Sequence, residues 1–126
     1  MRREELLARV QDRKELLGLT IDNIAKLSGL GNRTVTRFFT GEDVKLSTVE
    51  KITNLLGLDF AGNEMIDIDI LREQRATQKA LYIVSLVQDT SALEKQGLDD
   101  AGLNLLIKET KEQFLHGEYH RNLWAS

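Results

Sequence analysis

Apolar residues recur every three or four positions through the first sixty or so residues, which is the spacing of one face of a helix. Four such runs predict four short helices, over residues 2–17, 20–28, 32–40 and 48–56. Gly18, Gly29 and Gly57 follow three of them, and glycine commonly ends a helix in the left-handed conformation. Four short helices are enough to close a small core.

Polar residues mark the starts of two of these helices. Thr20 is an N-cap candidate, with Asn23 three residues later where a full capping box has Glu or Gln. Ser47 and Glu50 have the complete capping-box spacing. The fourth helix is therefore expected to begin at Thr48, with Ser47 as its cap.

The pattern changes after Gly62. Residues 63–70, NEMIDIDI, alternate apolar and acidic positions, which fits either a short strand or an extended linker. A long helix is predicted from about Leu71 to Val87, with an extension toward Lys95 left open. Asp89-Thr90-Ser91 can interrupt it, because all three side chains compete for helical backbone hydrogen bonds.

The last stretch predicts one more helix. Asp99 or Asp100 is its expected cap, and Gly117 its expected end. The tail that follows holds Trp124, the only tryptophan. We therefore expect an N-terminal domain over residues 1–62 and a helical extension over 63–126.

Composition supports an all-helical chain without disulfides. The 126 residues include no proline and no cysteine, and no apolar run is long enough to span a membrane. The N-terminus lacks the apolar core of a signal peptide, so a cytoplasmic location is expected. The net charge of −3 is unevenly divided, with ten Lys or Arg and nine Asp or Glu in residues 1–62 against seven and eleven in 63–126. Only the first part can present a local basic face.

The stretch from Thr20 to Thr40 organises the chain. Its two predicted helices flank a turn at residues 28–32, and the outward positions of the second helix are neither apolar nor acidic. This is the arrangement of a helix-turn-helix, whose second helix enters the major groove of DNA. Base contacts are predicted for Asn32, Arg33, Thr34, Thr36, Arg37 and Thr40. Phosphate contacts are predicted for Thr20, Asn23, Lys26, Lys45, Ser47 and Thr48.

The run from Thr20 to Leu58 resembles the Xre/Cro/C1-type helix-turn-helix proteins, the phage-repressor-like group. The resemblance rests on Ala25, Gly29, Val35 and Phe38, the Gly41 turn, the Leu46-Ser47-Thr48-Val49 entry and the Leu55-Leu56-Gly57-Leu58 exit. It implies an all-α fold with a lambda-repressor-like domain of four to five short helices, here followed by an extension of two longer helices. It also implies DNA binding, usually as a homodimer on two-fold-related half-sites, and transcriptional control.

The sequence departs from many relatives at two places. Thr20-Ile21 stands where many have Gln, and Gly31-Asn32-Arg33 stands where many have Ser-Arg-Ser/Thr-type residues. The DNA sequence that this chain recognises therefore cannot be inferred from the target of a relative. The function that this resemblance predicts most directly is that of a repressor, which blocks polymerase at the promoter of its own or a neighbouring operon.

The second half predicts a contact surface for another chain. Its candidate residues are Ala76, Ala80, Ile83, Val84, Val87, Leu123 and Trp124. Either a homodimer or a cognate protein partner can use such a face. The alternative function is therefore an antitoxin whose C-terminal half binds a toxin while the N-terminal domain regulates the operon.

Other chemistry has weaker support. Glu112, His116 and His120 have a spacing that can bind a metal, but Gly117 falls between the histidines and a third strong ligand is lacking. The pairs Asp67 with Asp69, and Asp99 with Asp100, can bind magnesium but are better explained as strand and cap residues. No nucleophile is paired with a base. We expect no metal, no cofactor and no enzymatic activity.

Overall fold

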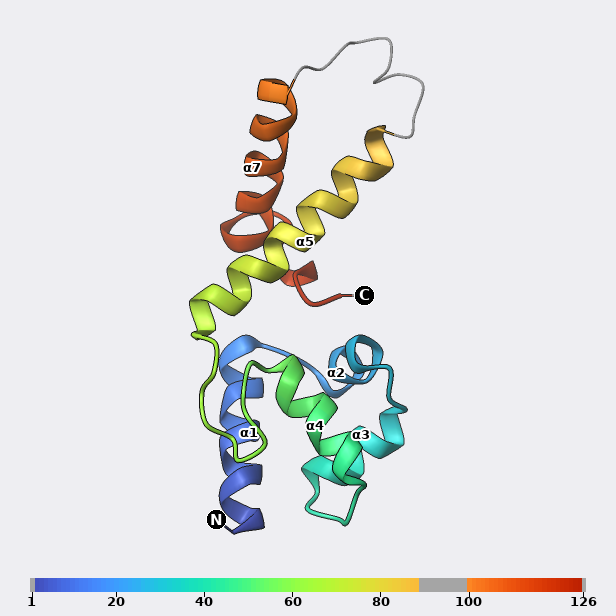
Figure 1. The fold of residues 1–126 in the computed structure, drawn as a ribbon. Coiled ribbons are helices and arrows are strands. Elements are labelled where there is room, and N and C mark those ends of the chain that lie inside the picture. Colours follow the sequence, from blue (N-terminus) through green and yellow to red (C-terminus); the bar gives the residue numbers. More distant parts are fainter. Residues whose placement is uncertain (1, 89–99, 126) are drawn as a thin grey trace. The chain divides into compact units, whose positions relative to one another are not determined.

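The computed structural model describes residues 2–88 and 100–125, with the side chains of 87 and 88 left out (Figure 1). The described residues form six α-helices and a short 3-10 helix, η1, and they contain no strand. The expected all-α fold is confirmed. By contacts the chain divides into two compact units, one of residues 1–71 with 125–126 and one of residues 72–124. The boundary that the sequence predicts at Gly62, between an N-terminal domain and a helical extension, stays a prediction.

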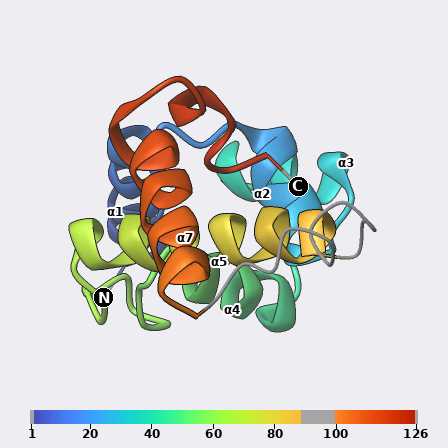
Figure 2. The same cartoon turned by 90° about the horizontal axis from the view of Figure 1, so that it is seen from above.

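Unit 1 is built from α1 (Arg3–Leu17), α2 (Ile21–Ser28), α3 (Asn32–Phe39) and α4 (Leu46–Leu55). Figures 1 and 2 show α2 and α3 joined by a short turn, with α4 beside them. One apolar side chain from each helix, and one just after α4, is fully buried: Val10, Ile24, Val35, Ile52 and Leu56. Full burial of such a side chain contributes roughly 1.5–3 kcal/mol. These residues hold the four helices in one core.

The junctions on either side of α2 agree with the sequence prediction. Gly18 and Gly29 follow α1 and α2 in the left-handed conformation, with φ of 71° and 70°. Thr20 Oγ1 accepts a hydrogen bond from the Asn23 amide at 3.0 Å, and Asn23 Oδ1 accepts one from the Thr20 amide at 3.1 Å. Asn23 therefore completes a reciprocal capping box in the place of Glu or Gln. Both ends of α2 are fixed by local hydrogen bonds.

The predicted start of α4 is wrong. The helix begins at Leu46 with Lys45 as its N-cap, and no side chain caps it. Ser47 lies within the first turn, so it cannot close a capping box with Glu50. The earlier start places Thr48 and Val49 on the inner face of the helix, where they are 5% and 9% exposed. Packing outweighs the local capping signal here.

The segment before α5 is an extended linker, and the strand alternative is wrong. Only an isolated bridge pairs Leu58 with Glu64. The amides of Met65 and Ile66 donate to the Gly57 carbonyl at 2.9 and 3.0 Å, which fastens the linker to the end of α4. Helix α5 (Ile68–Gln88) begins earlier than predicted because Asp67 Oδ2 accepts from the Asp69 amide at 3.0 Å.

A buried arginine joins α1 to this linker. Arg13 is only 7% exposed, and its Nε donates to the Leu56 carbonyl at 3.0 Å. Its guanidinium also donates to the Ile66 carbonyl and lies 3.6 Å from the Glu64 carboxylate. Arg13 therefore donates hydrogen bonds to one carbonyl at the end of α4 and to one in the linker, and in this way connects α1 to both.

A turn after α4 depends on one carboxylate. Asp59 Oδ1 accepts from the amides of Asn63 and Ala61 at 2.8 and 2.9 Å, and Oδ2 accepts from Asn63 Nδ2 at 3.1 Å. The backbone hydrogen bond from Asn63 is the main cause that lowers the pKa of Asp59 below its usual value of 3.8. The ionised carboxylate is therefore the form that the folded turn binds.

Replacing Asp59 should change the acid sensitivity of the fold. A pKa that is lower in the folded state gives stability that is present above about pH 4 and is lost as pH falls through the folded value. We expect Asp59→Asn to lower the thermal midpoint at pH 7 and to narrow its gap to wild type between pH 4 and pH 3. Circular dichroism melts across this range measure both. A constant gap at every pH would contradict the role of the charge.

Unit 2 holds α5 beyond its first turn, α7 (Asp100–His116) and η1 (His120–Asn122). Lys111 Nζ lies 2.8 Å from Glu73 Oε1, and Lys79 Nζ lies 5.8 Å from the centre of the Phe114 ring, so α5 and α7 pack side by side (Figure 1). Helix α7 ends just before Gly117, as predicted. The predicted interruption at Asp89-Thr90-Ser91, the extension toward Lys95 and the Asp99 cap lie outside the described residues.

Candidate nucleic-acid interface

Helix α3 divides cleanly into an inner and an outer face. Val35 and Phe38 are 0% and 6% exposed and fix the helix to the core. The six residues predicted to contact bases lie on the other positions of α3 and on its C-cap. Asn32, Arg33, Thr36, Arg37 and Thr40 are exposed, and Thr34 is half-buried. The structure therefore brings all six onto one element, with only polar groups facing outward.

These outward residues differ in how firmly the protein itself holds them. The side chain of Arg33 makes no hydrogen bond or ion pair within the part of the chain that the structure describes. Arg37 Nε lies 3.7 Å from Glu42 Oε1, and the Thr40 hydroxyl has Glu42 Oε2 at 3.0 Å and the Arg37 carbonyl at 3.1 Å. Arg33 is therefore the cation on α3 that is free to meet an external ligand.

The candidates on α2 are largely engaged. Thr20 and Asn23 form the capping box, and Lys26 Nζ lies 3.1 Å from Asp22 Oδ2. All three remain at least partly exposed. The first turn of α2 is thus held rigidly at the surface next to α3.

The start of α4 offers a more open set of groups. Lys45 and Ser47 are exposed, and the amides of Leu46 and Ser47, like the first amides of any helix, have no acceptor within the helix. Such free amides at a helix N-terminus favour an anion. Thr48 is only 5% exposed, although it also lines the hollow between α3 and α4, and its phosphate contact stays a prediction.

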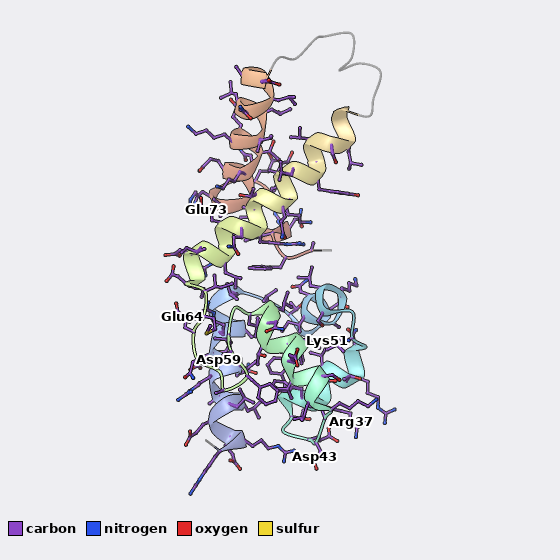
Figure 3. All side chains as sticks on the ribbon, in the orientation of Figure 1. Arg37, Asp43, Lys51, Asp59, Glu64 and Glu73 are labelled. Carbon is purple, nitrogen blue, oxygen red and sulfur yellow. The ribbon has the colours of Figure 1, made fainter. Side chains whose placement is uncertain are left out.

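A hollow of about 630 Å³ lies between α3 and the start of α4. Its lining includes three cations, Arg37, Lys45 and Lys51, together with Thr34 and Ser47. Figure 3 shows Arg37 and Lys51 reaching from α3 and α4. Sequence reasoning missed Lys51, although it lies one helical turn after Ser47 and that spacing places the two on the same face. Lys45 and Lys51 have no acidic partner among the described residues.

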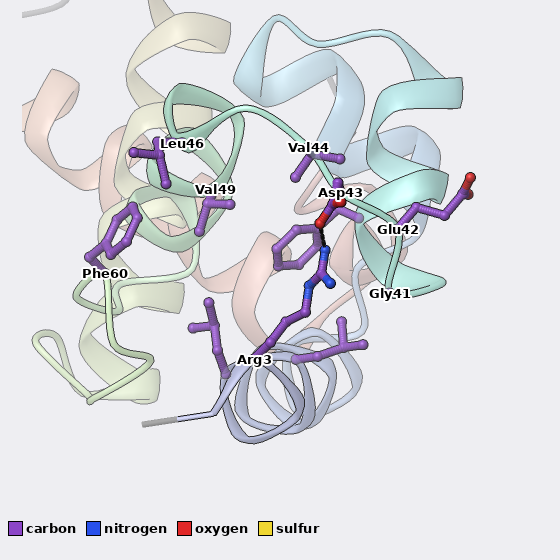
Figure 4. Close-up of a pocket in the computed structure, with 11 residues that line it drawn as sticks. Arg3, Gly41, Glu42, Asp43, Val44, Leu46, Val49 and Phe60 are labelled. Carbon is purple, nitrogen blue, oxygen red and sulfur yellow. Dashed lines mark hydrogen bonds and ion pairs between the residues drawn. The ribbon is translucent and has the colours of Figure 1, made fainter.

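One acid also lines this hollow, and an arginine pairs with it. Asp43 forms an ion pair with Arg3 of α1, drawn as a dashed line in Figure 4. The pair lies at a second, mainly apolar hollow of about 280 Å³, whose lining includes Leu7 and Phe38. Arg3 therefore offsets the negative charge of Asp43, and the surface around the α3–α4 hollow keeps an excess of positive charge.

Two of the residues considered for metal chemistry have other contacts. His120 Nδ1 lies 3.3 Å from the Phe114 carbonyl, and Asp67 caps α5. Within residues 2–88 and 100–125 no group of three His, Asp or Glu side chains gathers in a way that could hold a metal ion. None of the described helices has the length and apolar content needed to cross a membrane.

The predicted partner-contact residues of unit 2 are mostly covered within the chain itself. Ala76, Ala80, Val84, Leu123 and Trp124 are between 0% and 8% exposed, and Ile83 is half-buried. Arg75 Nε donates to the Leu123 carbonyl at 2.9 Å, which ties the tail to α5. The side chain of Val87 lies outside the description. In this conformation the exposed apolar side chains of α5 are others, among them Leu81, Tyr82 and Leu86.

Taken together, a rigid turn between α2 and α3, a polar α3 and a cationic hollow beside it define a helix-turn-helix domain. Comparison with known proteins agrees: residues 10–63 match the model of a family described as helix-turn-helix, which confirms the resemblance of this part of the chain to the Xre/Cro/C1-type proteins.

One relative extends the comparison. An Archaeoglobus fulgidus protein named "Putative HTH-type transcriptional regulatory protein" is 35% identical over 71 residues, which cover 52% of this chain and 23% of that protein. The chain therefore spans less than a quarter of the length of this curated relative. No solved structure matches the chain.

Proposed function

We propose that this protein is a sequence-specific regulator of transcription that binds double-stranded DNA with α3 in the major groove. The observation that carries the proposal is the outer face of α3, where an unpaired Arg33 lies among polar residues next to the cations of the α3–α4 hollow. Side chains on such a face can read base edges, while the flanking cations and the free amides of α4 bind phosphates.

The charge distribution favours moderate, salt-sensitive affinity. Lys26 and Arg37 already form ion pairs with acidic side chains. A DNA phosphate that binds either cation must compete with that acid, so few phosphates are neutralised without competition. Specific recognition must then come from contacts to bases more than from a broad basic field. Selection from a randomised double-stranded DNA library, followed by gel shifts of the winning sequences, tests the proposal. Failure to enrich any sequence would overturn it.

We further propose that the regulator acts as a homodimeric repressor. Family resemblance supports this, because related domains bind two half-sites about 34–36 Å apart on one face of the duplex. The selected sequences should then contain an inverted repeat. Light scattering of the protein–DNA complex should give two chains per duplex, and a reporter driven by such a site should be silenced. One chain on a single, non-repeated site would contradict the dimer.

Lys51 should act on phosphate and not on sequence. We expect Lys51→Ala to weaken binding to selected and unselected duplexes alike, and to lower the slope of log affinity against log salt by about 1. Fluorescence anisotropy over a salt series measures this. Lys108→Ala removes the same charge from exposed α7 and is the matched control, expected to leave the slope unchanged. A selective loss on the chosen site alone would mean that Lys51 reads bases.

The alternative function is an antitoxin whose residues 63–126 bind a toxin while residues 1–62 regulate the operon. The observation in its favour is that α5 leaves Leu81, Tyr82 and Leu86 about half exposed or more on an acidic half of the chain. Co-purification of the full chain with the product of the adjacent gene tests it, with Tyr82→Asp as the variant expected to release the partner. Equal capture by both, or by neither, argues against this role.

A further inference from the structure

The apolar hollow of about 280 Å³ in unit 1 has no part in the proposed contact with DNA. It lies between the first turns of α1, the turn from α3 to α4 and the start of α4 (Figure 4). Leucine, valine and phenylalanine side chains form most of its wall, and Phe38 of α3 is one of them. Two further wall residues, Leu46 and Phe60, are 72% and 49% exposed. The hollow is therefore an apolar surface that a ligand can reach from solvent.

The volume of the hollow suits a small molecule. It equals the space that roughly nine water molecules occupy in the liquid, so an occupant of about ten non-hydrogen atoms fills it. Apolar walls favour a hydrocarbon body, because each methylene group removed from water strengthens binding by up to about fourfold. The walls alone therefore select a short aliphatic or aromatic body.

One cation lies at the edge of these apolar walls. Arg3 is the first residue of α1, and its Nη2 forms the ion pair with Asp43 that Figure 4 draws as a dashed line. A guanidinium has five N–H donors, so most of those of Arg3 remain available to a second acceptor. No side chain caps α1, and the free amides of its first turn also favour an anion. The cation and the helix terminus thus select a carboxylate as the head group.

The two acids in the wall do not exclude such an anion. Glu42 Oε1 lies 3.7 Å from Arg37 Nε, and in Figure 4 the side chain of Glu42 points away from Arg3. The side chain of Asp43 is 96% exposed, and an ion pair this exposed contributes little, so another carboxylate can replace it. A carboxylate attached to a hydrocarbon body also gains the burial of that body, which Asp43 does not.

Asp43 connects the apolar hollow to the α3–α4 hollow, because it lines both of them. We propose that the apolar hollow is a regulatory site for a small amphipathic organic acid, whose carboxylate takes Arg3 from Asp43. The charge of Asp43 is then no longer offset, and it repels phosphates beside Lys45 and Lys51 in the α3–α4 hollow. Binding of the acid therefore weakens binding of DNA. The inference rests on the proposed DNA-binding function and adds its regulation.

The first experiment measures binding of the acid to the full chain without DNA. Octanoate is the probe, and isothermal titration calorimetry gives its affinity. Wild type should bind octanoate about 4- to 15-fold more tightly than hexanoate, which has two methylene groups fewer. Arg3→Ala should lose about tenfold in affinity for octanoate, and should bind octan-1-ol, which has no carboxylate, as wild type does. Arg2→Ala removes the same charge outside the wall and is the matched control, expected to bind octanoate as wild type does.

The second experiment measures the coupling to DNA by fluorescence anisotropy of a labelled, selected duplex. Octanoate should lower the DNA affinity of wild type by about 3- to 10-fold at low salt and by less at high salt, because ions screen the repulsion. Acetate at the same concentration controls for ionic strength. Asp43→Asn should bind octanoate and yet keep its DNA affinity when octanoate is added, since it has no charge to release. Arg3→Ala should bind DNA as weakly as wild type does with octanoate.

The possible failures can be told apart. Equal octanoate affinity of wild type and Arg3→Ala, or a loss of DNA affinity with octanoate that persists in Asp43→Asn, overturns the inference. Absence of octanoate binding also overturns it, and if Leu46→Asp then separates a dimer in light scattering, the occupant of the hollow is a second copy of the chain. A wild-type chain that enriches no DNA sequence overturns the proposed function, whereas the calorimetry is independent of DNA.

Discussion

Arg33→Ala should lose sequence-specific DNA binding while the fold stays intact. Arg33 is the second residue of α3, is exposed and has no partner among the described residues, so its guanidinium can bridge a guanine edge. Removing one bidentate base contact costs about 1–3 kcal/mol, which is roughly a 5- to 150-fold loss at each half-site. Binding to unselected duplexes should fall far less. Gel shifts on the selected site and on a scrambled duplex measure the two effects.

Arg121→Ala serves as the control for that loss. Arg121 is an exposed arginine of η1, and its removal changes the net charge equally. Its affinity for the selected site should match that of wild type. If Arg33→Ala also retained wild-type affinity for that site, α3 would not be the element that reads bases in this protein.

Arg13→Ala should strongly destabilise unit 1. It leaves the buried carbonyl of Leu56 and the partly buried carbonyl of Ile66 without their guanidinium donor, and each such buried group costs about 1–3 kcal/mol. We expect a total loss of about 3 kcal/mol, which lowers the thermal midpoint of a domain of this size by roughly 10–20 °C. Thermal and urea melts followed by circular dichroism measure this.

Arg3→Ala is the matched control from the same helix. Its ion pair with Asp43 is exposed, with side-chain exposures of 54% and 96%, and such pairs contribute about 0–1 kcal/mol. Equal destabilisation by the two variants would mean that Arg13 acts only as a surface charge. Arg13→Lys should fall between them, because an ammonium group cannot span both carbonyls.

The helix-turn-helix was predictable because its signals are local. The apolar spacing, the glycines after α1 and α2, and Thr20 with Asn23 each act within a few residues, and the bounds of α1 to α3 agree with the prediction to within one residue or so. The same locality explains why the outward face of α3 could be named residue by residue. A helix with two buried apolar positions has little freedom in which side it exposes.

Contacts between residues that lie far apart in the sequence could not be predicted. The hydrogen bonds from Arg13 to Leu56 and Ile66 span more than forty residues, and nothing near Arg13 in the sequence indicates them. The hydrogen bond from Asn32 Nδ2 to Asp22 Oδ1 depends on the angle at which α2 and α3 meet. The start of α4 was misplaced for a related reason, since burial of Val49 outweighs the preference of Ser47 for a cap.

In unit 2 the sequence predicted the apolar face of α5 but left open what that face packs against. An apolar helix face is equally suited to the chain's own core or to another chain, and the sequence does not say which. The structure places Ala76, Ala80 and Val84 under cover and leaves Tyr82 62% exposed. A search for a partner surface should therefore begin at Tyr82.

The aromatic residues are distributed so that the two units can be observed separately. The single tryptophan and both tyrosines, Trp124, Tyr82 and Tyr119, fall within residues 72–124, while residues 1–71 have only phenylalanine as aromatic side chains. Intrinsic fluorescence excited at tryptophan or tyrosine wavelengths therefore originates in unit 2 alone, and circular dichroism sums the helices of both. A melt that gives one midpoint by fluorescence and another by circular dichroism would show that the two units unfold independently.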